Sequence, residues 1–199
     1  MEQSCAEVLI LLGGGIDSSA LIPFYLSRGM KVQGVHFNYG QPSAVGERRS
    51  VIALSDYYNI PVFTVDLKLP IVCVNWEYRG RNALLLLAAA NVISAGPILL
   101  SIAIHAGTPY YDCSRTFLMD MARIFDGYFG GTIGIEAPFI DFTKPDIFEF
   151  CLQNEVPISL TYSCERHAES PCGECPSCKD REMLYAGYRN LQGTQSSGR

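Results

Sequence analysis

The chain has 199 residues, 48% of them hydrophobic, which is enough to bury the core of a single domain and little more. A formal net charge of -5 argues against a nucleic-acid-binding protein, because such proteins need a basic face to displace counterions from phosphates. A small anionic ligand is not excluded, since backbone amides hold phosphates without net positive charge.

Short apolar runs alternate with amphipathic stretches along the chain. The apolar runs predict strands at residues 7–12, 31–38, 62–67, 98–104 and 135–137. Apolar residues at helical spacing predict helices at about residues 20–26, 43–58, 82–95, 114–125, 141–154 and 179–191, followed by a polar tail at residues 193–199. This alternation predicts an α/β fold: a mostly parallel sheet with helices on both faces, in one domain that spans residues 1–192. Ligands of such sheets bind beyond the carboxyl ends of the strands.

Capping residues mark the start of two predicted helices. Ser114 or Thr116 is expected to cap the helix at 114–125. Thr143, followed by Pro145 and Asp146, forms a capping pattern for the helix at 141–154.

The location of the protein is predicted from two features that the sequence does not show, a secretory signal and a membrane span. Residues 1–7 have no basic region of the kind that opens a secretory signal, so we expect a cytoplasmic protein. Gly96 and Pro97 divide the apolar stretch 83–104 into a helix and a buried strand, each too short to span a membrane. In a reducing compartment, the eight cysteines are expected to be thiols or metal ligands, not disulfides.

A glycine-rich turn joins the first predicted strand to the first helix. Gly13, Gly14 and Gly15 let the backbone bend sharply and approach a ligand, and the amides that follow lie at a helix N-terminus, which favours an anion. Asp17 and Ser18 add a carboxylate for the metal side of the site and a hydroxyl donor. The turn lacks the lysine of a Walker-type loop and the third glycine of a dinucleotide-binding loop. A tight turn that merely caps the helix is the alternative.

Four cysteines lie close together in residues 164–178, which are expected to form a loop without periodicity. Spacings of two residues allow thiolates to converge on one ion, and four sulfurs suit a structural Zn²⁺ with no open position. An iron–sulfur cluster is the alternative, and its colour would distinguish it. His167 is close enough in sequence to replace Cys164 as a ligand. The predicted ligands are Cys164, Cys172, Cys175 and Cys178.

Two histidines and the remaining thiols need separate interpretations. His36, on the second strand, is expected to be buried and hydrogen-bonded in the core. His105 ends the fourth strand near the expected site, so a structural and a functional role are equally open. Ordinary thiols without assigned chemistry are Cys5, Cys73, Cys113 and Cys151.

Six short motifs, in a fixed order, carry a resemblance to a known family. They are G-G-G-I-D-S at 13–18, Y-G-Q at 39–41, G-R-N at 80–82, Y-Y-D-C-S-R at 110–115, P-F-I-D-F-T-K at 138–144, and S-C at 163–164 with P-C-G-E-C-P-S-C at 171–178. They resemble the motifs S-G-G-x-D-S, Y-G-Q, G-R-N, Y-P-D-C-R, P-L-I-D-L-S-K and S-C…P-C-G-x-C-x-S-C of the 7-cyano-7-deazaguanine synthases, which are PP-loop ATP pyrophosphatases. The likeness extends over roughly residues 8–185.

Membership of this family implies a five-stranded parallel sheet, a structural Zn²⁺, Mg²⁺ with ATP, and a homodimer. It also implies the adenylation of 7-carboxy-7-deazaguanine with release of pyrophosphate, as a step in queuosine biosynthesis. Ammonia then gives an amide, and a second ATP converts the amide to the nitrile.

The resemblance also assigns residues to roles. It implies catalysis by Asp17, Ser18 and Lys144. It places ATP and pyrophosphate at Leu12, Gly13, Gly14, Gly15, Ile16, Asp17, Ser18, Ser19, Arg81 and Asn82. The substrate is expected at Tyr39, Gln41, Asp112 and, from its place at a strand end, His105. A helix cap is the alternative for Asp112, and a solvated lysine at a helix start is the alternative for Lys144.

The chain departs from the family pattern at four places. Gly13 replaces the first serine, and the usual basic residues after Y-G-Q are replaced at 42–44. The segments 67–81 and 105–108 are shorter than usual, and the second loses acidic residues near the substrate. We therefore expect ATP activation to be retained while the substrate or the acceptor differs.

Three hypotheses follow. The first is a ligase that forms the amide or nitrile. The second is an enzyme that joins the activated acid to an amine of a protein partner, since diverged members of this family occur in bacterial gene clusters linked to phage defence. The third is a degenerate PP-loop binding module without catalysis. A sulfur-transfer enzyme acting on tRNA is disfavoured by the acidic charge.

Overall fold

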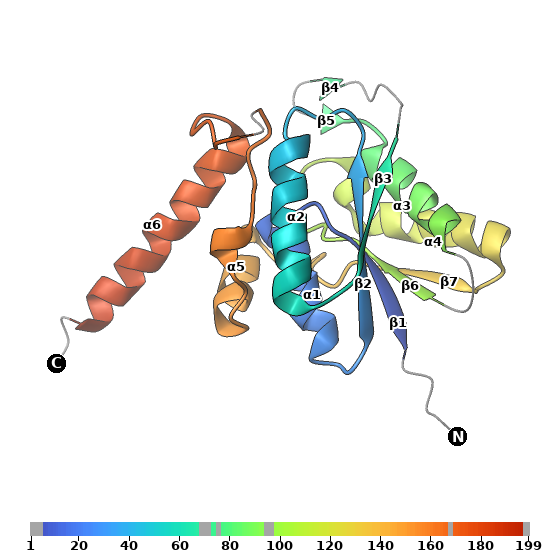
Figure 1. Cartoon of the computed structure of the whole chain (residues 1–199), viewed down its shortest axis with the longest axis horizontal. Coiled ribbons are helices and arrows are strands. Elements are labelled where there is room, and N and C mark those ends of the chain that lie inside the picture. The colour runs from blue at the N-terminus through green and yellow to red at the C-terminus, as the bar shows by residue number, and fades with distance from the viewer. Residues whose placement is uncertain (1–5, 68–72, 75–76, 94–97, 167–168, 197–199) are drawn as a thin grey trace.

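A central parallel sheet organises the fold, as Figure 1 shows for the computed structural model. The structure describes residues 6–67, 73–74, 77–93, 98–166 and 169–196. The sheet has five strands in the order β3-β2-β1-β6-β7, all parallel: β1 (Glu7–Leu11), β2 (Lys31–Asn38), β3 (Val62–Asp66), β6 (Ile98–Ser101) and β7 (Ile133–Glu136). Two short strands, β4 (Cys73–Val74) and β5 (Glu77–Tyr78), form a separate antiparallel pair.

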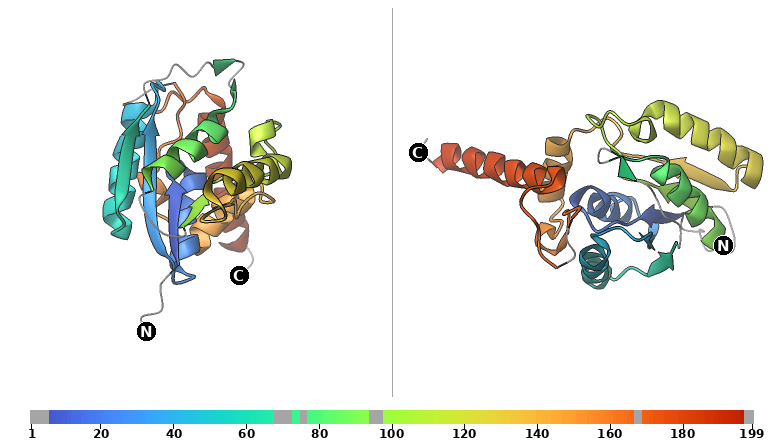
Figure 2. Two further views of the ribbon diagram at one scale, coloured as in Figure 1. Left: turned by 90° about the vertical axis from the view of Figure 1, so that its right-hand side faces the viewer. Right: turned by 90° about the horizontal axis from the view of Figure 1, so that it is seen from above.

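Helices cover both faces of the sheet (Figure 2). One core cluster lies between the sheet and α1 (Ile16–Leu26), α2 (Ala44–Tyr58) and α5 (Lys144–Gln153). A second cluster lies between the opposite face and α3 (Arg81–Val92) and α4 (Arg115–Phe129). Strands buried on both faces read as apolar runs, which is why residues 7–12 predicted a strand. The α/β prediction of a parallel sheet covered on both sides is confirmed.

The last helix, α6 (Pro176–Ser196), projects away from the body of the domain (Figure 1). Its first half still contacts the core, because the ring of Phe148 packs edge-on against Tyr185 and Tyr188, with centroids 5.5 and 6.3 Å apart. Two 3-10 turns, Tyr111–Cys113 and Ile158–Leu160, complete the described elements.

Both predicted caps are confirmed. The Ser114 hydroxyl accepts a hydrogen bond of 3.1 Å from the amide of Phe117 at the start of α4. Thr143 and Asp146 form a reciprocal capping box at α5, with a proline in the first turn. Each cap accepts a hydrogen bond from a backbone amide that has no partner inside its helix.

Several boundaries differ from the sequence predictions. β6 ends at Ser101 instead of 104, and the next residues become part of a cavity wall. The helix α6 begins at Pro176, inside the predicted loop 164–178, since proline is well suited to a first helical position. It continues to Ser196, so residues 193–196 of the predicted polar tail are helical. The pair β4 and β5 and both 3-10 turns were not predicted, because two or three residues give no readable period.

The apolar stretch 83–104 contains α3 and β6, as predicted from its Gly-Pro break; residues 94–97 lie outside the described part. Among the helices in the described ranges, none combines the length and the apolar composition that a membrane crossing needs.

Candidate active site and metal centre

The glycine turn after β1 depends on one glycine in particular. Gly14 has φ +79, and a Cβ at this position would lie 2.9 Å from the carbonyl oxygen of Glu47. Its own carbonyl oxygen accepts hydrogen bonds of 2.8 Å from the Ser50 hydroxyl and from the amide of Tyr162. At Gly13, by contrast, an added Cβ would meet only the Ser18 hydroxyl oxygen, at 4.0 Å. The turn is therefore tied both to α2 and to the segment that leads to the cysteines.

The first turn of α1 is reinforced by two serine hydroxyls. Both donate to the carbonyl oxygen of Gly15, Ser18 at 3.2 Å and Ser19 at 2.7 Å. The first amides of a helix have no intrahelical partner, and those of α1 lie beside the cavity described next. This end of α1 is suited to an anion.

A cavity of about 430 Å³ opens over the carboxyl ends of the central strands. It is lined by the ends of β1 and β2 and by residues that follow β6, where the strand order reverses, which is where open parallel sheets bind ligands. Twelve of the predicted site residues line it: Leu12, Gly13, Gly15, Ile16, Asp17, Ser18, Tyr39, Arg81, Asn82, His105, Asp112 and Lys144. The ligand Cys164 lies at its edge.

Three predicted site residues are placed behind the cavity wall. Gly14 and Ser19 are buried in the turn, and Gln41 is 6% exposed. The amide group of Gln41 is committed to the protein: its oxygen accepts from the Tyr39 amide at 2.9 Å, and its nitrogen donates to Glu47 at 2.8 Å. Gln41 therefore supports the turn that carries Tyr39, and the structure does not bring its side chain to the ligand.

Asp112 holds the start of α3. A carboxylate oxygen of Asp112 accepts a bond of 3.3 Å from the amide of Asn82, and the Asn82 side chain donates to the Asp112 carbonyl at 3.0 Å. The helix cap considered as the alternative for Asp112 is thus present, on α3. Its carboxylate also lines the cavity, so capping does not remove it from the site. Burial raises the pKa of the neighbouring Cys113 to about 11, so this thiol is not activated, although it lines the cavity.

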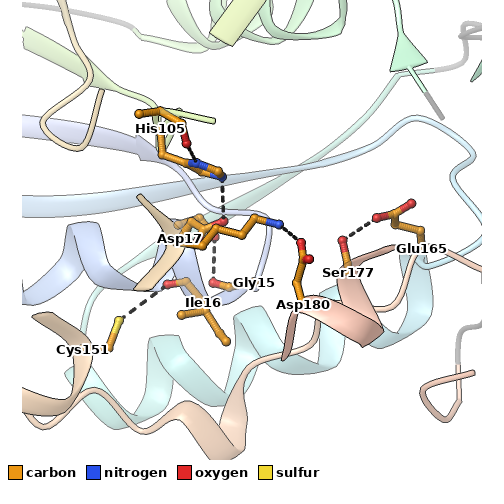
Figure 3. Close-up of polar contacts among 11 residues, drawn as sticks. Gly15, Ile16, Asp17, His105, Cys151, Glu165, Ser177 and Asp180 are labelled. Atoms are coloured by element: carbon orange, nitrogen blue, oxygen red, sulfur yellow. Dashed lines mark hydrogen bonds and ion pairs between the residues drawn. The ribbon is translucent and has the colours of Figure 1, made fainter. Parts of the chain in front are cut away.

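Charged groups gather around Asp17, at the start of α1 (Figure 3). Its carboxylate lies 3.8 Å from Nε2 of His105, whose Nδ1 is 2.7 Å from the carbonyl oxygen of Ala106. Although 35% of the side chain is exposed to the cavity, burial raises the pKa of Asp17, while His105 and Lys144 oppose the shift. Because burial removes water from the Asp17 carboxylate, a cation that coordinates it would stabilise its charged form.

Lys144 reaches this group from the first residue of α5. Its ammonium group forms an ion pair with Asp180 on α6. Lys144 is therefore not simply a solvated lysine at a helix start, and only 33% of its side chain is exposed.

The sequence interpretation missed several residues that line the cavity after β7. They come from the segment between α5 and α6 and from the first turns of α6: Tyr162, Ser163, Glu165, Ser177, Asp180, Arg181 and Leu184. Ser163 and Ser177 belong to the cysteine motif quoted above, while for the others proximity to Cys164 and Cys178 in sequence was the available signal. A second cavity, of about 490 Å³, shares His105, Lys144 and Asp180 with the first and extends along residues 105–110.

His36 is buried at 1% exposure, and its Nδ1 lies 3.2 Å from the carbonyl oxygen of Leu12. Burial lowers the pKa of His36, so the ring is neutral at physiological pH. The predicted burial is confirmed, but Nε2 of His36 has no hydrogen-bond partner among the described residues, and the residue also lines the cavity. Cys151 is likewise buried, and burial raises its pKa to about 12, as expected of an ordinary thiol.

The four predicted cysteines converge. Their sulfur atoms all lie within 4.8 Å of one another, and those of Cys172 and Cys178 are 3.9 Å apart. An ion with Zn–S bonds of about 2.3 Å would set ligand sulfurs about 3.8 Å apart in a tetrahedron. The amides of Glu174 and Cys175 point at Sγ of Cys172 at 3.4 and 3.3 Å, and these bonds lower its pKa.

This cluster fits a soft tetrahedral ion in both geometry and chemistry, since thiolates are the ligand form and amide bonds stabilise them. Cys164 and Cys175 are buried, as suits a closed structural site. The alternative ligand His167 lies outside the described residues.

The fold and the position of the cavity define the class of protein. A parallel sheet whose central strand leads through a glycine turn into a helix, with a cavity at the switch in strand order, is a PP-loop fold, here with a cysteine cluster near the C-terminus. A family model described as "Queuosine biosynthesis protein QueC" matches residues 7–75 and 74–189, so the chain belongs to this family.

Named proteins that are similar in sequence agree with this family assignment. A 7-cyano-7-deazaguanine synthase of Desulfitobacterium hafniense is 28% identical over 90% of this chain and 88% of its own length. One from Thermoplasma volcanium is 28% identical over 92% and 88%. Among solved structures, a predicted subunit of tRNA methyltransferase from Methanocaldococcus jannaschii aligns with a TM-score of 0.50 at 12% identity, over 74% of each chain. That likeness concerns the fold alone.

Proposed function

We propose that this chain is an ATP-dependent ligase that adenylates the carboxylate of a 7-deazaguanine acid in the 430 Å³ cavity. The observation that carries the proposal is the convergence on this cavity of an anion-binding helix start, Asp17 and Lys144. Family membership and the names of the relatives, 7-cyano-7-deazaguanine synthases, support the choice of acid.

The chemistry requires one displacement at phosphorus. A carboxylate oxygen of the acid attacks the α-phosphorus of ATP, and the bond to the β-phosphate oxygen breaks, which releases pyrophosphate and leaves an acyl-adenylate. An amine nitrogen then attacks the acyl carbon and loses a proton, and AMP leaves. With ammonia the product is the primary amide, which a second ATP activates at its oxygen; loss of AMP and two protons gives the nitrile.

The chain's own groups match the charges that develop. The amides at the start of α1 would donate to the leaving pyrophosphate, and the Ser18 hydroxyl would join them by exchanging its bond to the Gly15 carbonyl oxygen for one to a phosphate. The ammonium of Lys144 offsets negative charge on the phosphates, and Arg81 offers a fork for a phosphate or for the carboxylate of the acid. Each of these groups acts where charge increases during the reaction.

Two metal ions belong to the proposal. Mg²⁺ would be held by Asp17 together with ATP phosphates, and when bound it would neutralise phosphate charge. Zn²⁺ would be held by the four cysteines as a structural ion. A homodimer and a cytoplasmic location are part of the same proposal.

A larger amine as acceptor is the second candidate, and the second cavity favours it. This cavity of about 490 Å³ shares residues with the reaction site, so an acceptor bigger than ammonia has room to approach. The acceptor in this case would be a primary amine on a protein partner. Mass spectrometry of the product distinguishes a free amide or nitrile from a modified protein.

The proposed function is tested by pyrophosphate release from ATP and Mg²⁺ with 7-carboxy-7-deazaguanine present or omitted. We expect release that depends on the acid and is abolished in Asp17→Ala. Release that ignores the acid would contradict the choice of substrate. No release from folded, metal-loaded protein would favour a binding module that has lost catalysis.

A further inference from the structure

We propose that Asp180 is a positioning residue for Lys144, which it holds at the cavity through their ion pair. The inference rests on the proposed function only for the role of Lys144 in the reaction. Asp180 belongs to none of the motifs that carry the family resemblance; it follows Cys178 by two positions.

The contact lies within the reaction site. The Lys144 ammonium donates to a carboxylate oxygen of Asp180, and 33% and 32% of the two side chains are exposed. Both residues line both cavities (Figure 3 shows Asp180 below Asp17 and beside Ser177). An ion pair that is mostly shielded from water in this way is screened less than one on the surface.

Lysine needs such a partner to act at a fixed place. Its four-carbon stem is flexible, so an unpaired ammonium would sample many positions around the cavity. The group has three N–H donors, and one bond to Asp180 leaves two for phosphate oxygens. The ion pair is therefore compatible with the role of Lys144 toward ATP and reduces the freedom that must be lost when ATP binds.

Asp180 stands on a rigid support. Cys175 and Cys178 of the cysteine cluster flank the start of α6, and the amide of Lys179 donates to the Cys175 carbonyl at 3.1 Å. The next residue, Arg181, donates to the hydroxyl of Thr161 at 2.8 Å and to the carbonyl of Ile158 at 2.8 Å. The Arg181 bonds therefore hold the first turns of α6, which carry the Asp180 carboxylate, and an ion bound by the four cysteines would fix them further.

The opposite role for Asp180 would be competition. In that case the carboxylate would hold Lys144 away from ATP until phosphates displaced it, and its removal would speed the reaction. Positioning and competition therefore predict opposite effects of the isosteric change Asp180→Asn.

A double-mutant cycle tests the proposal in the full-length, metal-loaded protein. We expect Asp180→Asn to lower kcat for acid-dependent pyrophosphate release about tenfold, with a smaller change in the KM for ATP. In a Lys144→Ala background the same change should have almost no further effect. Asp180→Glu should restore part of the activity, and Glu182→Gln, an exposed change on the same helix, is the matched control. Metal content and melting temperature should stay at the wild-type values.

Equal losses from Asp180→Asn in both backgrounds would overturn the proposal, and so would a higher rate in the single variant. A second measurement does not depend on activity: acetylation of Lys144 by an amine-reactive reagent, quantified by mass spectrometry relative to the exposed Lys179. Asp180→Asn should raise Lys144 labelling several-fold, and unchanged labelling would show that the ion pair does not hold the lysine. If wild-type protein releases no pyrophosphate, the proposed function fails while labelling still decides on the ion pair.

Discussion

The backbone amide of Tyr162 donates a hydrogen bond of 2.8 Å to the carbonyl oxygen of Gly14. Two residues later the chain reaches Cys164, a member of the cysteine cluster. Because the Ser50 hydroxyl donates to the same carbonyl at 2.8 Å, the glycine turn is held both by α2 and by the segment that enters the cluster. The conformation of the glycine turn therefore depends on residues far from it in sequence.

The two glycines of the turn should respond differently to substitution. Gly14→Ala should lower the free energy of unfolding by about 1–3 kcal/mol, because φ is +79 and the new Cβ would lie 2.9 Å from the Glu47 carbonyl oxygen. ATP binding should be lost with it. Denaturant unfolding and calorimetry with ATP measure both effects.

Gly13→Ser is the matched change, and it restores the serine of the family motif. Its Cβ would meet only the Ser18 hydroxyl oxygen, at 4.0 Å, so we expect stability within about 0.5 kcal/mol of wild type. The added hydroxyl should raise kcat/KM for ATP several-fold, as expected for one extra donor to a charged group. A destabilisation as large as that of Gly14→Ala would show that the two positions are not distinct.

The charged carboxylate of Asp17 should lower the free energy of unfolding at neutral pH. Since burial raises its pKa, the folded state keeps a proton over a pH range in which the unfolded chain has released it. The free energy of unfolding therefore decreases as the pH rises from about 3.9, the pKa in the unfolded chain, to the raised pKa of the folded state. Above the raised pKa this loss of stability stays constant. Asp17→Asn should melt at a higher temperature than wild type at pH 7, with no difference below about pH 4.

The same variant should lose at least about 100-fold in activity, because the asparagine carries no charge to offset a metal ion. Protein free of Mg²⁺ and ATP, but with the cysteine site loaded, is the appropriate sample for the melting curves, since an ion bound to Asp17 would mask the cost. A lower melting temperature for Asp17→Asn at pH 7 would contradict the account.

The cysteine cluster should hold a single structural ion. Cys175→Ser should reduce bound metal to near zero and lower the melting temperature sharply, because the closed site stabilises the segment before α6. Cys113→Ser removes a thiol outside the cluster and should leave the metal content unchanged. Elemental analysis gives the metal: a colourless protein fits Zn²⁺, and a brown one would show an iron–sulfur cluster.

Asp112 should stabilise the start of α3, although it lies 30 residues away from Asn82 in sequence. Loss of its bond to the Asn82 amide in Asp112→Ala should cost about 1 kcal/mol, as for other capping carboxylates. Asp141→Ala breaks an ion pair with Arg115 whose side chains are 65% and 67% exposed, and should cost about 0.5 kcal/mol or less. Urea unfolding compares the two, and equal costs would remove the case for a cap.

The sequence allowed the sheet, the main helices and the convergence of the four cysteines to be predicted because each has a local signal. Buried strands are apolar runs, and α4 and α5 begin at recognisable caps. The short pair β4 and β5 has no such signal. The roles of Gln41 and Asp180 could not be predicted either, since both follow from contacts between segments that only the fold brings together.

Adenylation of the acid, the central claim, is tested most directly by isotope transfer. The acid labelled with ¹⁸O in its carboxylate is incubated with ATP, Mg²⁺, ammonia and the metal-loaded protein, and the AMP is analysed by mass spectrometry. We predict one ¹⁸O atom in the phosphate of AMP, because the oxygen that attacks the α-phosphorus leaves with AMP. AMP without ¹⁸O, or ADP with labelled inorganic phosphate, would contradict attack at the α-phosphorus.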